Sequence, residues 1–168
     1  MAPDVPDVLR CTALDADALA IWVAACGMQL HWVAADAAIP GSYWGDDEAG
    51  LIANRLYIRP DTPVHSLLHE LGHWLCMDAQ RRATVHTNAC GSDTEENAVC
   101  YLQALLAPTL PGYDRTRLFA DMDAWGYHFI AGSAAAWFTG DSDDALGYLQ
   151  THGLVDAAGA YTGARRAH

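Results

Sequence analysis

The segment from Thr62 to Ala79 constrains the fold more than any other part of this chain. Thr62 and Pro63 form a helix start signal, a hydroxyl that can cap followed by a proline at the first helical position. Residues 69–73 then read His-Glu-Leu-Gly-His. In a helix, two histidines four positions apart lie about 40° apart around the axis and one turn apart along it. The sequence therefore predicts a helix over 63–79 that directs both imidazoles to one side.

His69, Glu70 and His73 form a pattern typical of a catalytic metal site. Neutral imidazole nitrogens are good zinc ligands, and a site with three protein ligands keeps its fourth position open for a water molecule. Glu70 can reach that water without ligating the ion, take its proton and pass it to a leaving amine. The motif predicts a zinc-dependent hydrolase of peptide bonds or, alternatively, a catalytically silent zinc-binding interaction or regulatory module. The plain structural alternative is an amphipathic helix with two surface histidines.

His65 extends the motif to three histidines at intervals of four residues. The helix rises about 12 Å from His65 to His73, so one ion cannot bind all three imidazoles. We expect His65 to lie beside the site as a neighbour rather than a ligand.

The motif leaves the third metal ligand undetermined. A histidine six residues after His73 is excluded, because Ala79 stands there. His86 lies in a segment with a loop-like sequence, and the 17 aspartates include none with a distinctive context. The choice therefore depends on the glutamates, of which the chain has only four.

Glu95 and Glu96 form a pair at the start of the next predicted helix. If Asp93 is the N-cap, Glu96 occupies the third helical position and completes a capping box, which gives it a structural role. Glu95 then lies on the apolar side of that helix, where a buried carboxylate needs a cation. We therefore expect Glu95 to be the third ligand, with Glu96, His86 or another residue as alternatives.

The two predicted helices together resemble the gluzincin metallopeptidases. The motif helix is followed by a helix that reads Glu-Glu-Asn-Ala at residues 95–98 and Leu-Leu-Ala-Pro at residues 105–108. This combination is similar to small ImmA/IrrE-type metallopeptidases and minimal gluzincins over about residues 51–108. The resemblance implies a zincin-like fold, one Zn²⁺ ion, three metal ligands and a general base. The residues it implies are the metal ligands His69, His73 and Glu95 and the general base Glu70.

The resemblance also suggests how substrate binds. In gluzincins the strand before the motif helix forms the lip of the cleft and pairs with an extended peptide. Residues 51–58 would do this here, with Asn54 and Arg55 as candidate substrate-binding residues, unless this is an ordinary edge strand. Gluzincins commonly stabilise the oxyanion with a downstream histidine or tyrosine. Tyr127 and His128 are the best-placed candidates, with His128 as the candidate catalytic residue, unless they belong to a packed aromatic cluster.

The charge balance excludes several kinds of partner. Nine arginines and no lysine face 21 acidic residues, which gives a net charge of −12. Too little positive charge is present to bind nucleic acid phosphates or an anionic membrane surface. We find no signal peptide, no apolar run near the ~18 residues of a membrane span and no Cys-x-x-Cys pair. We therefore expect a cytoplasmic protein whose partner is a peptide or protein substrate.

The order of the predicted elements indicates an α+β fold. We expect a small, mostly antiparallel sheet packed on the motif helix and the glutamate-bearing helix, with further helices toward the C-terminus. A single domain should cover residues 1–156, followed by a flexible tail over 157–168. The predicted helices cover residues 15–26, 63–79, 92–107, 114–125 and 142–151, and the predicted strands cover 28–34 and 51–58.

Overall fold

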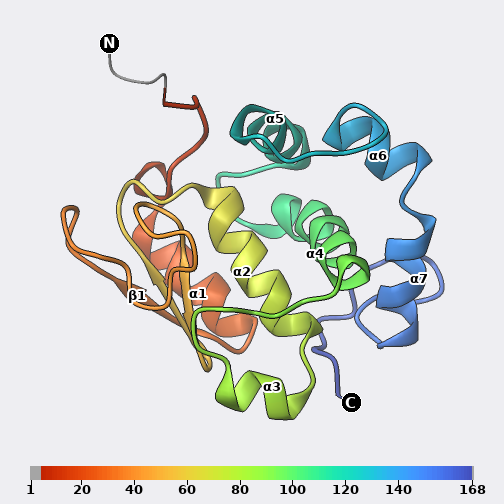
Figure 1. The fold of residues 1–168 in the computed structure, drawn as a ribbon, viewed down its shortest axis with the longest axis horizontal. Helices are drawn as coiled ribbons and strands as arrows, with labels where there is room; N and C mark the ends of the chain where they lie inside the picture. Colours follow the sequence, from red (N-terminus) through yellow and green to blue (C-terminus); the bar gives the residue numbers. More distant parts are fainter. Residues whose placement is uncertain (1–4, 168) are drawn as a thin grey trace.

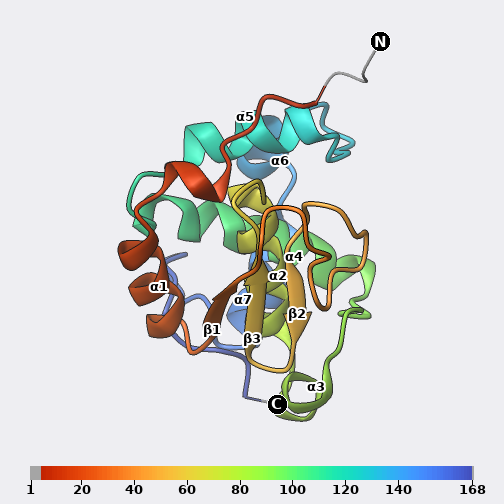
Figure 2. The same cartoon turned by 90° about the vertical axis from the view of Figure 1, so that its left-hand side faces the viewer.

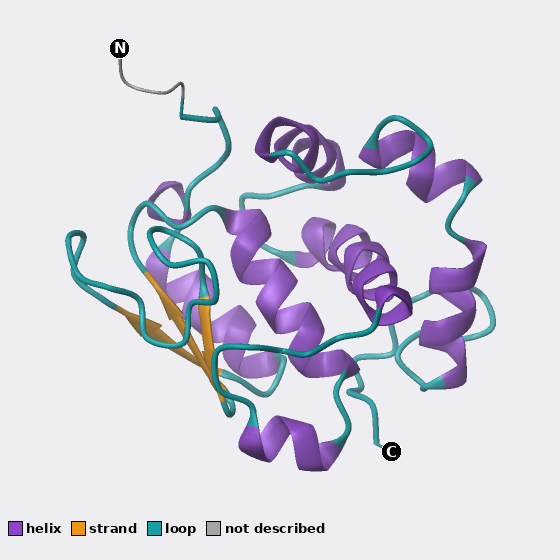
Figure 3. Ribbon diagram, viewed as in Figure 1, coloured by secondary structure: helices purple, strands orange, loops and turns teal. Residues whose placement is uncertain are grey.

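The helix with the His-Glu-Leu-Gly-His motif, α2 (Val64–Cys76), lies at the centre of the protein. The computed structural model describes residues 5–167 and has an α+β architecture. In Figure 1 a small sheet lies on one side of α2, and α4 (Asp93–Leu106) lies on the other side, with α7 (Asp143–Thr151) beyond it. Figure 3 shows that the strands are confined to one side of the molecule and that helices form the rest.

The other elements are short and surround this central pair of helices. In chain order they are η1 (Cys11–Ala13), α1 (Ala16–Ala25), β1 (Gln29–Trp32), β2 (Gly50–Ile52), β3 (Arg55–Ile58), α3 (Ala79–Thr84), η2 (Ala107–Thr109), α5 (Arg115–Trp125) and α6 (Ala134–Gly140). Because α2 is covered by the sheet and by α4, 11 of its 13 residues are buried. The motif therefore lies on a core helix rather than on a surface helix, which would bury a single stripe.

Gly72, inside the motif, is where α2 and α4 come closest together. A Cβ atom at this position would lie only 3.0 Å from Cγ1 of Val99 on α4. Leu68 and Leu71 of α2 and Ala98 and Val99 of α4 are all fully buried. The glycine thus permits the close packing of the two helices that carry the histidine and glutamate pairs.

The three strands form a mixed sheet in the order β1-β3-β2, which Figure 2 shows face-on. β1 pairs with β3 in parallel, and β2 pairs with β3 in antiparallel orientation. The prediction of a mostly antiparallel sheet is wrong because β1 pairs with β3 in parallel. Residues 51–58 also form a hairpin instead of the single strand that we expected. Its two-residue turn at 53–54 has Ala53 at φ +50°, and Ile52 pairs with Arg55. The hairpin makes β3 the central strand and β2 an edge strand.

The outer edge of β2 is covered by other parts of the chain. The N–H of Leu51 donates to the carbonyl of Gly41 (3.1 Å), and the carbonyl of Leu51 accepts from the N–H of Thr87 (2.8 Å). The N–H of Ala53, in the adjoining turn, donates to the carbonyl of Val85 (2.8 Å). Pairing of a further strand with Leu51 is therefore blocked on this side.

Most of the predicted helices are present. Those expected over 15–26, 92–107, 114–125 and 142–151 correspond to α1, α4, α5 and α7, and the strand expected over 28–34 corresponds to β1. The short helices η1, α3, η2 and α6 were not predicted.

The predicted motif helix differs from α2 at both ends. Thr62 does not cap it, because its hydroxyl accepts a hydrogen bond from the N–H of Arg59 (2.9 Å), and Pro63 is itself the N-cap. At the other end α2 stops at Cys76, and Asp78 caps the separate helix α3 by accepting from the N–H of Arg81 (2.8 Å). The first turn of α2 thus begins one residue later than expected.

The C-terminal segment, which we expected to be flexible, makes contacts with the central helix. The N–H of Arg166 donates to the carbonyl of Leu75 (2.9 Å), and Val155 forms an antiparallel bridge with Tyr161. Within the described residues, no helix is long and apolar enough to cross a membrane.

Candidate active site

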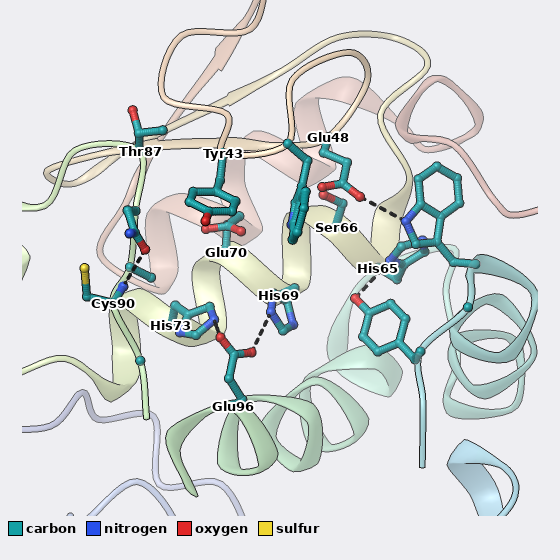
Figure 4. A pocket seen from close by; sticks show the side chains of 17 residues that line it. Tyr43, Glu48, His65, Ser66, His69, Glu70, His73, Thr87, Cys90 and Glu96 are labelled. Atoms are coloured by element: carbon teal, nitrogen blue, oxygen red, sulfur yellow. Dashed lines mark hydrogen bonds and ion pairs between the residues drawn. The ribbon is translucent and has the colours of Figure 1, made fainter. Parts of the chain in front are cut away.

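Three side chains of α2 and α4 converge on one point. His69 and His73 lie one turn apart on α2, and Glu96 lies in the first turn of α4. The Nε2 atom of His69 is 3.2 Å from Oε2 of Glu96, and the Nε2 atom of His73 is 2.9 Å from Oε1. One ligand atom from each of the three residues lies within 4.8 Å of the others. Figure 4 shows Glu96 pointing from α4 toward both imidazoles.

The second ring nitrogen of each histidine contacts a hydrogen-bond acceptor. His69 Nδ1 lies 3.0 Å from Oε1 of Gln103, and the amide nitrogen of Gln103 donates to the carbonyl of His65 (2.9 Å), which fixes the orientation of the amide. His73 Nδ1 lies 3.2 Å from Oε1 of Glu95. Both rings therefore carry a proton on Nδ1, and in the neutral form Nε2 presents a lone pair to the cluster.

This cluster has the chemistry of a cation site. Two imidazole lone pairs and a carboxylate repel one another unless a positive charge lies between them. Burial lowers the pKa of His73, but its hydrogen bonds to Glu95 and Glu96 outweigh burial and hold the pKa above its ordinary value. Burial likewise raises the pKa of Glu96, but the contacts with His69 and His73 lower it strongly overall. Two imidazoles and one carboxylate suit zinc and leave one coordination position open, so these residues could hold a zinc ion.

Glu70 lies next to the cluster, on the side of the pocket away from Glu96 (Figure 4). Burial raises the pKa of its carboxyl group, while the nearby His69 and His73 lower it, and the net shift is upward. A glutamate with a raised pKa is a stronger proton acceptor than a fully solvated one. Glu70 thus lies beside the two histidines, as the sequence led us to expect.

Glu95, the expected third ligand, lies behind His73 and does not face the cluster. Its side chain is only 4% exposed, compared with 46% for Glu96. Arg81 holds it with Nη1 at 2.7 Å from Oε2 and Nη2 at 3.0 Å from Oε1. Burial raises the pKa of Glu95, but the hydrogen bonds from His73 and Arg81 lower it to about 2. The structure therefore places Glu96, and not Glu95, with the two histidines.

The start of α4 explains why the two glutamates exchange roles. The N-cap is Ser92, whose hydroxyl accepts from the N–H of Glu95 (3.2 Å), and not Asp93 as expected. Glu95 therefore occupies the third helical position, and Glu96 has no capping role. The sequence Ser-Asp-Thr-Glu at 92–95 fits the capping pattern as well as Asp-Thr-Glu-Glu does, so this signal could have been recognised.

A cavity of about 500 Å³ adjoins the cluster. Besides residues of α2 and α4, three connecting segments line it, at residues 43–48, 87–91 and 125–127. The lining includes the carboxylates of Glu48, Glu70 and Glu96. Among residues 5–167, no arginine contributes to this lining. The lining therefore combines these three carboxylates with the imidazoles of His65, His69 and His73.

Tyr127 lines the pocket, whereas His128 is exposed and does not. Gly126, at φ 101°, ends α5 and turns the chain so that the Tyr127 hydroxyl reaches Nδ1 of His65 (3.1 Å). The Tyr127 ring also packs edge-on against His69, with the ring centroids 5.9 Å apart. His65 is thus the neighbour of the site that its position predicts, and Tyr127 is better placed than His128 to meet a substrate.

The other candidates from the sequence lie away from the cluster. Asn54 and Arg55 are exposed at the β2–β3 turn and do not line the pocket, because β3 is the central strand. His86 is exposed, and its Nδ1 contacts the hydroxyl of Thr87 (2.7 Å). Residues 87–91, which follow His86, do line the pocket.

Sequence reasoning missed the residues that support the cluster or face it from loops. Gln103 and Arg81 carry no local signal, and Glu48 is marked only by the scarcity of glutamate.

Comparisons with protein families, with curated proteins and with solved structures found no match for this chain. Any function must therefore be inferred from the geometry of the site.

Proposed function

We propose that this chain is a zinc-dependent metallopeptidase with His69, His73 and Glu96 as metal ligands and Glu70 as general base. The observation that carries this proposal is the convergence of two Nε2 atoms and a carboxylate beside Glu70. In an ordinary amphipathic helix with two surface histidines, nothing would bring a carboxylate of another helix to both Nε2 atoms. His73 is 3% exposed and lies between the carboxylates of Glu95 and Glu96, and this arrangement favours a positive charge between them, which a metal ion would supply when the imidazole is neutral.

The contacts around the ligands support the same proposal. Acceptors at Nδ1, here Gln103 and Glu95, fix the tautomer and orientation of a metal-bound histidine and increase its basicity. Arg81 in turn holds Glu95 in place through two hydrogen bonds. A zincin-like arrangement, with the motif helix between a small sheet and the helix that supplies the acidic ligand, is part of this proposal.

The proposed reaction is hydrolysis of a peptide bond. A zinc ion supplies a water molecule with a lowered pKa and polarises the scissile carbonyl. The Glu70 carboxylate takes a proton from the attacking water and delivers it to the leaving amine. The upward shift in the pKa of Glu70 favours the first of these transfers, because a carboxylate with a higher pKa is a stronger base.

The Tyr127 hydroxyl is the proposed donor to the oxyanion. Burial lowers the pKa of His65 to about 3, so this imidazole is neutral. With its proton on Nδ1, His65 donates to the Tyr127 oxygen (3.1 Å) and leaves the phenolic hydrogen free to donate to a substrate. His65 is then a positioning residue that acts through Tyr127.

Metal analysis and a peptide cleavage assay test the proposal together. The protein, purified without chelators, should contain one zinc ion per chain and should cleave members of a mixed peptide library. Chelation should abolish cleavage, and added zinc should restore it. Zinc without any cleavage would favour a silent zinc-binding module, and a protein that binds no zinc would overturn the proposal altogether.

A further inference from the structure

Glu48 is the one glutamate without a place in the proposed mechanism, yet it lines the same pocket. It belongs to the segment 43–48, of which Tyr43, Trp44 and Glu48 line the cavity, and Figure 4 shows Tyr43 and Glu48 on the opposite side of the cavity from Glu96. Its Oε1 atom accepts a hydrogen bond from the indole N–H of Trp125 (3.0 Å). The carboxylate is therefore held in place by a neutral donor and carries its negative charge into the pocket.

The charge of Glu48 is not neutralised by an arginine of the pocket. Arg10, the arginine that packs on Trp125, forms a salt bridge with Asp47 (2.6 Å) and donates to the carbonyl of Asp61 (2.9 Å). It does not line the cavity. The chain contains no lysine at all. Glu48 thus keeps capacity for a cationic partner from outside the protein.

Two exposed aromatic side chains of the same segment line the pocket together with Glu48. Tyr43 is 55% exposed and Trp44 is 76% exposed, and both line the pocket. Their rings pack edge-to-face with centroids 5.0 Å apart. Aromatic faces beside a carboxylate are the surroundings that bind ammonium and guanidinium groups.

The segment is anchored to the helix that carries the metal ligands. The N–H of Ala49 donates to the buried hydroxyl of Ser66, one turn before His69 on α2 (2.9 Å). Gly50 packs so closely on Pro40 that a Cβ atom would lie 1.9 Å from its carbonyl oxygen. Glu48 therefore has a fixed position relative to the bond that would be cleaved.

We propose that Glu48, together with Tyr43 and Trp44, binds a cationic group of the peptide substrate. This inference rests on the proposed peptidase function. The cationic group is an arginine or lysine side chain near the scissile bond or the free α-amino group of the peptide. Acidic side chains should bind poorly beside Glu48, because its carboxylate would repel them and, within the described chain, no arginine lines the pocket.

Calorimetric binding to the zinc-loaded full chain with Glu70→Gln tests this inference, because that variant should bind peptides without cleaving them. Three acetylated and amidated peptides would differ at one position only, with arginine, glutamine or glutamate there. A fourth would be the glutamine peptide with a free amino terminus. Either the arginine peptide or the free-amino peptide should bind at least about tenfold more tightly than the blocked glutamine peptide. Which of the two does so identifies the source of the cation.

Two further substitutions show whether Glu48 causes the preference. Glu48→Gln keeps an acceptor for Trp125 but removes the charge, and it should reduce the preference to less than about threefold. Asp46→Asn is the matched control: Asp46 is exposed, lies outside the pocket lining, and has φ 55°, which asparagine tolerates. It should leave the preference intact.

The outcomes separate this inference from the proposed function. Equal affinities for all four peptides, no binding of any of them, or a preference that survives Glu48→Gln would overturn the inference. Cleavage by the unsubstituted protein without charge preference would leave the peptidase proposal standing. Charge-selective binding without cleavage would support the inference and count against the peptidase.

Discussion

The two walls of the pocket hold their side chains in different ways. The helical wall consists of His69, Glu70 and His73 of α2 and Glu96 of α4, and its histidines contact acceptors at both ring nitrogens. The loop wall consists of Tyr43, Trp44 and Glu48, in which the aromatic rings are exposed and the Glu48 carboxylate accepts a hydrogen bond from an indole. The histidines of the helical wall use both ring nitrogens in contacts within the protein, whereas the loop wall keeps exposed rings and a carboxylate that can contact a substrate.

This difference suggests that the two walls have different functions. A wall whose geometry is fixed by helix periodicity and buried hydrogen bonds is suited to hold an ion and a base, which every substrate uses in the same way. A wall with unused charge and exposed rings is suited to distinguish one substrate from another. Substitutions in the helical wall should therefore change rates for all substrates alike, and substitutions in the loop wall should change the ratio between substrates.

Glu70→Gln should have the largest effect. Because the amide cannot accept the proton, kcat/KM should fall by about 10²- to 10⁴-fold for cationic and neutral peptides by the same factor. Zinc content should stay at one ion per chain, since Glu70 is not a ligand. Metal analysis and steady-state kinetics on both peptides would measure this. Cleavage at the unsubstituted rate would rule out Glu70 as the base.

The two neighbouring glutamates of α4 should differ in their effect on zinc. Glu95→Gln keeps the ligand set and removes only support for His73, so zinc affinity should fall by about 10- to 100-fold. Glu96→Gln removes a ligand and should weaken zinc binding more. Competition with a chelator of known affinity would give both values. The opposite order would move the third ligand to Glu95, as the sequence alone suggested.

Tyr127→Phe tests the comparison of the two walls in a residue that combines features of both. Tyr127 lies in the loop after α5, but its hydroxyl contacts His65 of α2. It should therefore behave like the helical wall, with kcat lowered by about 10²-fold for all peptides and zinc affinity unchanged. His128→Ala, at the exposed neighbouring position, should leave kcat unchanged. An unchanged kcat in Tyr127→Phe would show that this hydroxyl does not donate to the oxyanion.

Trp44→Ala should have the smallest effect. An exposed cation–π contact contributes about 0.5–1 kcal/mol, so kcat/KM for cationic peptides should fall by about two- to fivefold. Neutral peptides should be cleaved as before, because the contact depends on charge. A parallel loss for both peptide classes would place Trp44 with general substrate binding instead of charge recognition.

The helical wall could largely be predicted from the sequence because helix periodicity is a local property. The spacing of His69 and His73 fixes their relative direction once the segment is a helix. The choice between Glu95 and Glu96 depends on which residue is the N-cap of α4, and Ser92 and Asp93 are both favoured residues for that position. Only the packing of α4 against α2, with Arg81 behind Glu95, distinguishes them.

The sheet and the loop wall could not be predicted because they depend on contacts between distant residues. The alternation over 51–58 looks the same in one strand and in a hairpin, and Ala53 is an unusual residue for a position with positive φ. The parallel pairing of β1 with β3 requires a crossover connection, which cannot be predicted from the local sequence pattern. Glu48 accepts a hydrogen bond from Trp125, which lies 77 residues further along the chain, so its place in the pocket is a result of tertiary folding.

A crystal structure of the zinc-loaded protein, with anomalous scattering measured at the zinc edge, would test the central claim most directly. We expect a single anomalous peak at about 2.0–2.2 Å from Nε2 of His69, Nε2 of His73 and a carboxylate oxygen of Glu96. Glu95 should remain bound to Arg81 and to Nδ1 of His73. A zinc-loaded crystal with no peak between these residues, or with the ion bound by Glu95, would contradict the account.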